Sequence, residues 1–298
     1  MSVADDKRAV LRAAMTSGKP VVVIGAHDAM SARLAGLYGF DAVWVSGLGV
    51  STMAHAIPDL NLITMTEALA AAVRIDRATP LPVIADCDNG FGGVSNVIRT
   101  VNEYERSGIA AICVEDNVFP KRNSLYTGAS RRELLPVKEM ARRISAGKAA
   151  QETEDFTFIA RIESFIAGHG LDDACRRAEA YVASGADAIL IHSRDKTLGE
   201  IESFLARWPQ ISNVPLVAVP TLFPSFTTAE LHAKGFNVVI LANQLMRASV
   251  QAMELTLKTL AETGVAASVD GGIATVDHVF DLVHTKETIE SEDQLAAG

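Results

Sequence analysis

Short runs of apolar, mostly β-branched residues recur along the chain, and the segments between them carry apolar residues three to four positions apart. The runs are typical of buried strands, and the spacing between them is typical of helices with one buried face. Strand followed by helix, eight times over, predicts an α/β fold, a (β/α)8 barrel of the TIM type. The strands are expected at residues 21–25, 42–46, 82–86, 110–115, 156–161, 187–192, 215–219 and 237–241, and helices between them at 29–38, 65–77, 95–106, 137–150, 171–184 and 198–207.

A helical pattern over residues 245–262 follows the eighth strand, and a short amphipathic run at 276–282 comes after it. These extra segments exceed what a minimal barrel needs, so we expect them to cap the barrel or to reach a neighbouring subunit. No change in composition marks a second domain. We therefore expect one domain over residues 1–298, with the barrel at about 20–262, a helical extension at about 263–298, and a frayed end over the last dozen residues.

Composition narrows the possible classes of protein. The chain has 298 residues, 49% of them hydrophobic and 21% charged, which favours a buried core over disorder. Its formal net charge of -9, without a Lys/Arg run, disfavours binding to nucleic acid or to an anionic membrane. Neither a signal peptide nor a membrane-spanning run is recognisable, so we expect a cytoplasmic protein. Its three cysteines have no CxxC spacing and indicate neither disulfides nor zinc.

Polar residues gather where the predicted strands end. In a barrel these carboxyl ends meet in one mouth, where barrel active sites lie. Asp86, Asp88 and Glu115 supply oxygen ligands of the kind that Mg²⁺ prefers, and Mn²⁺ or Co²⁺ could replace it. The alternative is that these carboxylates cap helices or pair with Lys and Arg.

Arg161 and His192 end the fifth and sixth predicted strands, and both can bind carboxylate or phosphoryl oxygens. A structural pair between Arg161 and Glu163 is the alternative. Lys121 and Asn123 follow the fourth strand in a polar loop, and we interpret them as ligand-facing residues on a movable segment. The glycine-rich stretch 89–93 lacks the spacing of a dinucleotide-binding or Walker motif.

Several motifs carry a family resemblance. They are Trp44-x-Ser46-Gly47-Leu48, Pro58-Asp59-x-Asn61, Asp86-x-Asp88-x-Gly90-x-Gly92, Glu115-Asp116-x-x-Phe119-Pro120-Lys121-x-Asn123-Ser124-Leu125, Ala160-Arg161-x-Glu163, Ile189-Leu190-x-His192-Ser193 and Ala242-Asn243-x-x-x-Arg247-Ala248. Together they resemble the phosphoenolpyruvate mutase family of the isocitrate lyase superfamily, over nearly the whole barrel.

The resemblance implies a Mg²⁺-dependent enzyme that interconverts phosphoenolpyruvate and phosphonopyruvate, forming the C–P bond of phosphonate biosynthesis. It implies that Asp86 binds the metal most directly, that Asp88 and Glu115 act largely through waters, and that Asp59 is the essential acid near the reacting carbon and phosphorus. The phosphoryl group would be held by Lys121, Asn123, Arg161 and His192, and the rest of the substrate by Trp44, Ser46, Gly47, Leu48, Ser124 and Asn243. The family also suggests a homotetramer, a dimer of dimers that exchange C-terminal helices.

The nearest alternative is phosphonopyruvate hydrolase, which resembles this chain but carries Thr where Asn123 stands. Asn123 therefore favours the mutase. The chain departs from many mutases at Asn117 and Asn89, where they have Lys and Thr. Carbon–carbon lyases of the superfamily carry a catalytic Cys in a Lys-Lys-Cys-Gly-His loop, and the corresponding residues 121–125 contain no thiol. A non-catalytic barrel is disfavoured because the metal-binding acids and Lys121 are all present.

Overall fold

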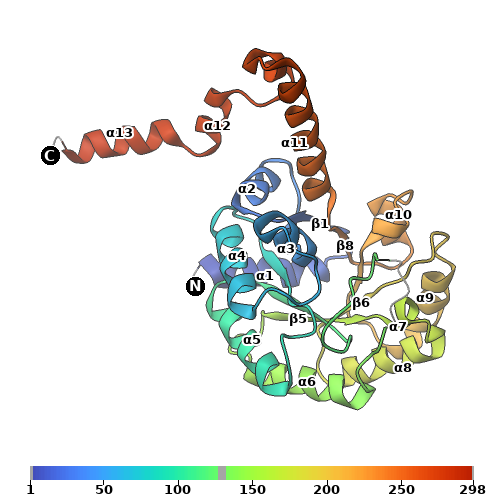
Figure 1. Ribbon diagram of the computed structural model, residues 1–298. Coiled ribbons are helices and arrows are strands. Elements are labelled where there is room, and N and C mark those ends of the chain that lie inside the picture. Colours follow the sequence, from blue (N-terminus) through green and yellow to red (C-terminus); the bar gives the residue numbers. More distant parts are fainter. Residues whose placement is uncertain (1–2, 127–131, 297–298) are drawn as a thin grey trace. The chain divides into compact units, whose positions relative to one another are not determined.

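Eight parallel strands close into a barrel with helices packed around it (Figure 1). The computed structural model describes residues 3–126 and 132–296. Each strand pairs with the next in chain order, and the last pairs with the first. The predicted (β/α)8 barrel is therefore confirmed. Its strands are β1 Val21–Ala26, β2 Ala42–Val45, β3 Val83–Asp86, β4 Ala111–Glu115, β5 Thr157–Ile162, β6 Ala188–Ile191, β7 Leu216–Ala218 and β8 Val238–Leu241.

The helices predicted between the strands are present, with ends that agree to within about one turn. They are α2 Ala29–Leu37, α4 Met65–Arg77, α5 Val94–Arg106, α6 Val137–Ala150, α8 Gly170–Ala183 and α9 Gly199–Ile211. Local chemistry fixes some of the boundaries. The Thr64 hydroxyl accepts from the Glu67 amide, and the Glu67 carboxylate accepts from the Thr64 amide at 2.7 Å, which is a capping box that starts α4.

Other helical segments were not predicted from the sequence, and all of them except α1 have nine residues or fewer. They are α1 Val3–Met15, α3 Gly47–His55, α7 Ser164–Ala167, α10 Thr228–Ala233 and the 3₁₀ turn η1 Pro220–Leu222. Two of them matter for the barrel mouth. α3 starts directly after β2, and η1 follows β7, so both follow the carboxyl ends of strands.

Side chains along each strand point alternately into the barrel and out toward the helices, so the barrel has two separate hydrophobic cores. Inward-facing residues form one buried cluster with Leu11 and Met15 of α1, whereas the outward-facing residues pack against the surrounding helices. The inward cluster includes Val23, Trp44, Ile84, Cys113, Ile159, Leu190, Val217 and Ile240. On six of these strands, the residue two positions after the inward-facing one also faces the barrel axis. These residues are Asp86, Glu115, Arg161, His192, Val219 and Ala242. The pattern that fills the barrel therefore also directs these side chains into its mouth.

The chain divides into two compact units, Met1–Met246 and Arg247–Gly298. The helices after the barrel are α11 Gln244–Thr263, the 3₁₀ helix η2 Ala266–Gly272, α12 Val276–Leu282 and α13 Thr285–Ala296. The expected frayed end is instead helical through Ala296. An ion pair between Lys286 and Glu290, one turn apart at 3.8 Å, supports α13.

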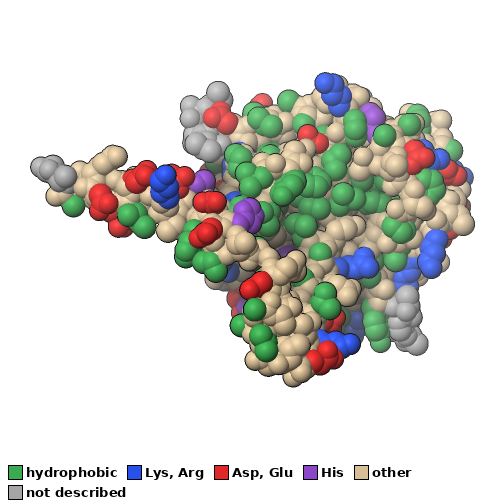
Figure 2. Space-filling view, turned by 90° about the horizontal axis from the view of Figure 1, so that it is seen from above, with side chains coloured by type: hydrophobic (Ala, Val, Ile, Leu, Met, Phe, Trp, Pro, Cys, Tyr) green, Lys and Arg blue, Asp and Glu red, His purple; other side chains and the backbone are tan. Residues whose placement is uncertain are grey.

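Apolar side chains are exposed along the C-terminal helices, among them Leu255, Leu257, Val276, Phe280, Ile289 and Leu295. Figure 2 shows apolar and acidic side chains together on this segment. A run of exposed apolar residues of this kind is typical of a surface that another protein covers. Within the described residues, no helix is both long enough and apolar enough to span a membrane.

Candidate active site

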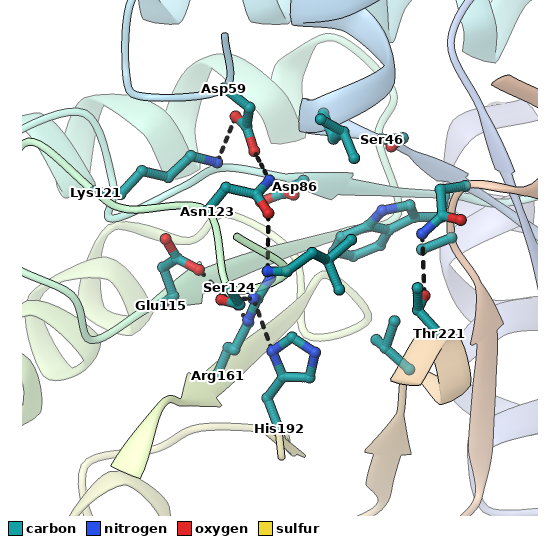
Figure 3. Close-up of a pocket in the computed structure, with 16 residues that line it drawn as sticks. Ser46, Asp59, Asp86, Glu115, Lys121, Asn123, Ser124, Arg161, His192 and Thr221 are labelled. Atoms are coloured by element: carbon teal, nitrogen blue, oxygen red, sulfur yellow. Dashed lines mark hydrogen bonds and ion pairs between the residues drawn. The ribbon is translucent and has the colours of Figure 1, made fainter. Parts of the chain in front are cut away.

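A pocket opens at the barrel mouth, where the strands end (Figure 3). Of the fourteen site residues predicted from the sequence, all but Gly47 and Asp88 line it, and these two lie directly beside it. The lining residues are Trp44, Ser46, Leu48, Asp59, Asp86, Glu115, Lys121, Asn123, Ser124, Leu125, Arg161, His192, Val219, Thr221, Ala242 and Asn243. The structure thus brings the predicted site residues together, while the chemical role of each stays a prediction.

Lys121 forms the centre of an ionic cluster on one side of the pocket. Its ammonium group lies 2.7 Å from a carboxylate oxygen of Asp59 and also donates to Asp88. Burial opposes the positive charge, but the two carboxylates outweigh it and raise the pKa of Lys121 well above its usual value. Burial raises the pKa of Asp88 to about 6, although Lys121 acts to lower it.

Asn61 and Asn123 join this cluster to the loop that carries Lys121. The Asn61 amide group donates to Asp88 at 2.9 Å, and its oxygen accepts from the backbone N–H of Lys121 at 2.5 Å. The Asn123 amide group donates to the second oxygen of Asp59 at 2.6 Å. The residue pair Asp59 and Asn61 therefore positions both loop residues at the pocket, as Figure 3 shows for Asp59, Lys121 and Asn123.

A second cluster surrounds Glu163, which is fully buried beneath the other side of the pocket. Its carboxylate accepts from Arg161 Nε at 2.5 Å and from the Ser124 hydroxyl at 2.6 Å. Burial disfavours ionised Glu163, but Arg161 and His192 outweigh burial and hold the pKa of Glu163 well below its usual value. Glu163 therefore carries a negative charge that Arg161 must balance. The pairing that sequence reasoning offered as an alternative to anion binding is present, and Arg161 nevertheless lines the pocket.

His192 presents one ring nitrogen to this cluster and the other to the pocket. Nδ1 lies 3.0 Å from both Arg161 Nη2 and Glu163 Oε1. Nε2 is buried and has no hydrogen-bond partner among the described residues. Burial lowers the pKa of His192, although Glu163 acts in the opposite direction. A neutral imidazole with an unused nitrogen is suited to bind a ligand.

The amino end of α3 forms a third wall. Ser46 caps the helix by accepting from the Gly49 amide at 3.1 Å, and Gly47 and Leu48 begin the first turn. A Cβ atom on Gly47 would lie 3.0 Å from Asp86 Oδ2, so a larger residue would crowd that carboxylate. Backbone N–H groups at a helix start are free to bind an anion. The amino end of α3 is therefore suited to bind the carboxylate of a ligand close to Asp86.

Asp86 and Glu115 offer oxygen donors suited to a divalent cation. Glu115 Oε1 is buried without a hydrogen-bond partner in the described part of the chain, and burial raises the pKa of Glu115 to about 7 despite Arg161 nearby. No group of three or more acidic, His or Cys side chains converges into a metal cluster within residues 3–126 and 132–296. Two hard oxygen donors are compatible with Mg²⁺, because this ion retains several waters and needs few direct carboxylates.

Comparison with known proteins identifies the family. The sequence model described as phosphoenolpyruvate phosphomutase matches residues 11–261. This chain belongs to the phosphoenolpyruvate phosphomutase family. The solved structure of phosphoenolpyruvate phosphomutase from Streptomyces platensis subsp. rosaceus is 43% identical, with a TM-score of 0.93 over 97% of this chain and 99% of that chain.

Phosphoenolpyruvate phosphomutase is not the sole activity among the relatives. The phosphonopyruvate hydrolase of Variovorax sp. (strain Pal2) is 40% identical over 277 residues, which are 93% of this chain and 94% of that protein. A solved complex of phosphonopyruvate hydrolase with oxalate and Mg²⁺ is 38% identical, with a TM-score of 0.89 over 96% of this chain and 98% of that chain. The family predicted from the sequence is confirmed, and overall similarity leaves both activities open.

Some residues at this phosphomutase-family site carried little signal in the sequence. Val219 and Ala242 follow from strand alternation, but Thr221 lies in η1, for which no periodicity exists. Thr221 accepts from the Asn243 amide at 3.0 Å, which leaves the buried Asn243 oxygen without a partner among the described residues. Sequence reasoning offered Glu163 as a partner of Arg161, but its hydrogen bond from the Ser124 hydroxyl at 2.6 Å is visible only in the structure.

We expect the Arg161→Met variant to be strongly destabilised because it leaves the Glu163 charge buried and unbalanced. Losing one partner of a buried ion pair typically costs about 3–5 kcal/mol of unfolding free energy. Urea denaturation measures this change. The double variant Arg161→Met/Glu163→Gln should recover part of the loss, and the exposed Arg142→Met should be near neutral. Wild-type stability in Arg161→Met would contradict the ionic role of Arg161.

Proposed function

We propose that this protein is a Mg²⁺-dependent phosphoenolpyruvate mutase, an isomerase that interconverts phosphonopyruvate and phosphoenolpyruvate in phosphonate biosynthesis. The observation that carries the proposal is the placement of Asn123, whose amide group donates to Asp59 at 2.6 Å inside the pocket. By resemblance, mutases of the family carry Asn at this loop position and the hydrolases carry Thr. Asn123 is therefore the residue that favours transfer of the phosphoryl group over its loss to water.

The pocket divides into parts that suit the two ends of phosphonopyruvate. The helix start at Gly47 and Leu48, with Ser46, would bind the carboxylate and carbonyl oxygens. Lys121, Arg161 and His192 would bind the phosphoryl oxygens, since two of them are cations and the third has a free ring nitrogen. This division would orient the phosphorus toward the loop and the pyruvyl group toward the acids.

The acids of the pocket favour a metal-assisted reaction. Asp86, with Asp88 and Glu115 nearby, would hold Mg²⁺, for which Mn²⁺ or Co²⁺ could substitute. When bound, the ion would neutralise negative charge that develops on the pyruvyl oxygens. A hydrolase of the family binds Mg²⁺ and oxalate, a dianion with adjacent oxygens like those of pyruvate.

The proposed reaction needs no second reactant. The C–P bond breaks, its electron pair passes to the pyruvyl group as an enolate, and the enolate oxygen then forms the new P–O bond. Such a phosphoryl group in transit is loosely bonded, so binding and charge balance carry most of the catalysis. Lys121 and Asn123 hold Asp59 at 2.7 and 2.6 Å, which places this acid beside the expected path of the phosphorus.

Phosphonopyruvate hydrolase is the second candidate, because a relative with this activity is 40% identical over nearly the whole chain. Hydrolysis would use the same residues, but water would capture the phosphoryl group and release pyruvate and orthophosphate. The two activities would then differ in how completely the loop at Lys121 and Asn123 excludes water.

We also propose a homotetramer, a dimer of dimers in which C-terminal helices are exchanged. The exposed apolar residues of α11 to α13, such as Leu257 and Phe280, support it because they need a protein surface to cover them. Light scattering of the purified protein should give four times the chain mass of 31.7 kDa. A monomer at micromolar concentration would rule the proposal out.

Phosphorus NMR tests the proposed activity directly. With phosphonopyruvate and Mg²⁺, the protein should convert the phosphonate signal to that of phosphoenolpyruvate, and a chelator should stop the conversion. The Asp59→Ala variant should be inactive yet folded, as circular dichroism would report. Conversion to orthophosphate would instead identify the hydrolase, and an active Asp59→Ala variant would remove Asp59 from the mechanism.

The loop argument predicts the effect of Asn123→Thr. The threonine hydroxyl lies one bond closer to the backbone than the Asn123 amide nitrogen and falls short of Asp59, so water should reach the phosphoryl group more often. We expect the fraction of phosphorus released as orthophosphate to rise by about tenfold, measured by NMR after a fixed conversion. Arg142→Thr removes an exposed arginine of α6 that is outside the pocket lining, and it should leave the fraction unchanged. Equal product ratios in wild type and Asn123→Thr would contradict the role of Asn123.

A further inference from the structure

The segment 121–126, which we call the rim segment, carries Lys121, Asn123 and Ser124 to the pocket. Backbone pairing fixes the base of the loop from which it extends. The Val118 amide donates to the Glu133 carbonyl at 2.9 Å, and the Leu135 amide donates to the Asp116 carbonyl at 2.8 Å. The rim segment has no such strand partner among the described residues, so other contacts must hold it.

Two arginines supply these contacts. Arg194 donates to the carbonyl of Ser124 at 2.8 Å and to that of Tyr126 at 2.7 Å. Arg132 donates to the carbonyls of Arg122, Asn123 and Tyr126 at 2.7, 2.8 and 2.6 Å. The two guanidinium groups therefore bind four backbone carbonyls of one short segment and meet at Tyr126.

Neither arginine is among the described residues that line the pocket. Their influence on the chemistry must therefore pass through the rim segment. Fixing the carbonyls of Asn123 and Ser124 also fixes the direction of their side chains, which reach Asp59 at 2.6 Å and Glu163 at 2.6 Å. Arg194 lies two residues after His192, so it ties the rim segment to the same strand end that supplies a pocket residue.

We propose that Arg132 and Arg194 are positioning residues that hold the rim segment over the pocket and thereby determine the partition between phosphoryl transfer and hydrolysis. The partition part of this inference rests on the proposed mutase function. Each guanidinium is planar and binds two or more carbonyls at once, which an ammonium group on a flexible stem reproduces poorly. The effect should therefore depend on the shape of arginine as well as on its charge.

Arg132 and Arg194 both donate to the Tyr126 carbonyl, and the repulsion between their positive charges would help the rim segment to detach from them. Burial and the neighbouring charge of Arg194 lower the pKa of Arg132, while Glu163 and Glu115 act in the opposite direction. Such a balance suits a segment that must close during the reaction and open for product release.

The variants Arg194→Lys and Arg132→Lys test the proposal, because each keeps the positive charge and loses the planar guanidinium that binds two carbonyls at once. Arg142→Lys is the control, since Arg142 is exposed on α6 and pairs with Glu139 there. Amide hydrogen exchange, followed by mass spectrometry, reports on the rim segment without any reaction. We expect peptides covering residues 121–126 to exchange about tenfold faster in both test variants and unchanged in the control, with the melting temperature of all three near that of wild type.

The second readout is the product ratio from phosphonopyruvate, measured by phosphorus NMR. We expect the orthophosphate fraction to rise several-fold in the two test variants, and to rise more in the variant whose rim segment exchanges its amide hydrogens faster. Unchanged exchange would overturn the positioning role, and faster exchange with an unchanged product ratio would overturn the link to partition. If the wild type itself releases only orthophosphate, the proposed mutase function fails, while the exchange measurement still decides whether the arginines hold the rim segment.

Discussion

The pocket at the barrel mouth buries more negative charge than its own cations balance. Asp59, Asp88, Glu115 and Glu163 are almost fully buried, Asp86 is partly buried in the same pocket, and the cations that face them are Lys121 and Arg161. Arg161 satisfies Glu163, and Lys121 is shared between two other acids. Burial raises the pKa of Asp88 to about 6 and of Glu115 to about 7, and neighbouring carboxylates raise both further, which reflects the remaining charge imbalance. A bound divalent cation would neutralise this excess negative charge. The site is therefore suited to ionic ligands whose charges complement those of the pocket.

The same imbalance ties the loop to the chemistry. Lys121 belongs to the rim segment, so moving that segment away would leave Asp59 and Asp88 as buried carboxylates without their cation. Uncompensated buried charge is costly, which favours the closed arrangement. In the proposed reaction, loop closure would exclude water and would also complete the charge balance of the pocket. A loop that merely covered the pocket would lack this coupling.

Much of the fold and of the site could be predicted because both follow from one local pattern. The recurring apolar strand segments identify the barrel. Continuing the inward-facing alternation by two residues at the strand ends identifies Asp86, Glu115, Arg161 and His192 as pocket residues. The remaining contacts could not be predicted, since they join distant positions through loops without periodicity. Arg194 is 70 residues from Ser124 in the sequence, and the partner of Asp88 turned out to be Lys121. Helix α13 was missed because its acidic composition resembles that of a disordered tail.

Two solved structures with different activities are both similar to this chain, at 43% identity for the phosphomutase and 38% for the hydrolase. This is expected if both reactions begin with cleavage of the same C–P bond in the same charged pocket. The outcome then depends on competition between recombination of the phosphoryl group with the enolate oxygen and its capture by water. Substrate-binding residues outside the loop would affect both routes alike, whereas the loop residues and the contacts that hold the loop closed would affect mainly the capture by water. Under the proposed roles, total identity would be a poor guide to the activity, and the contacts of the rim segment would be a better one.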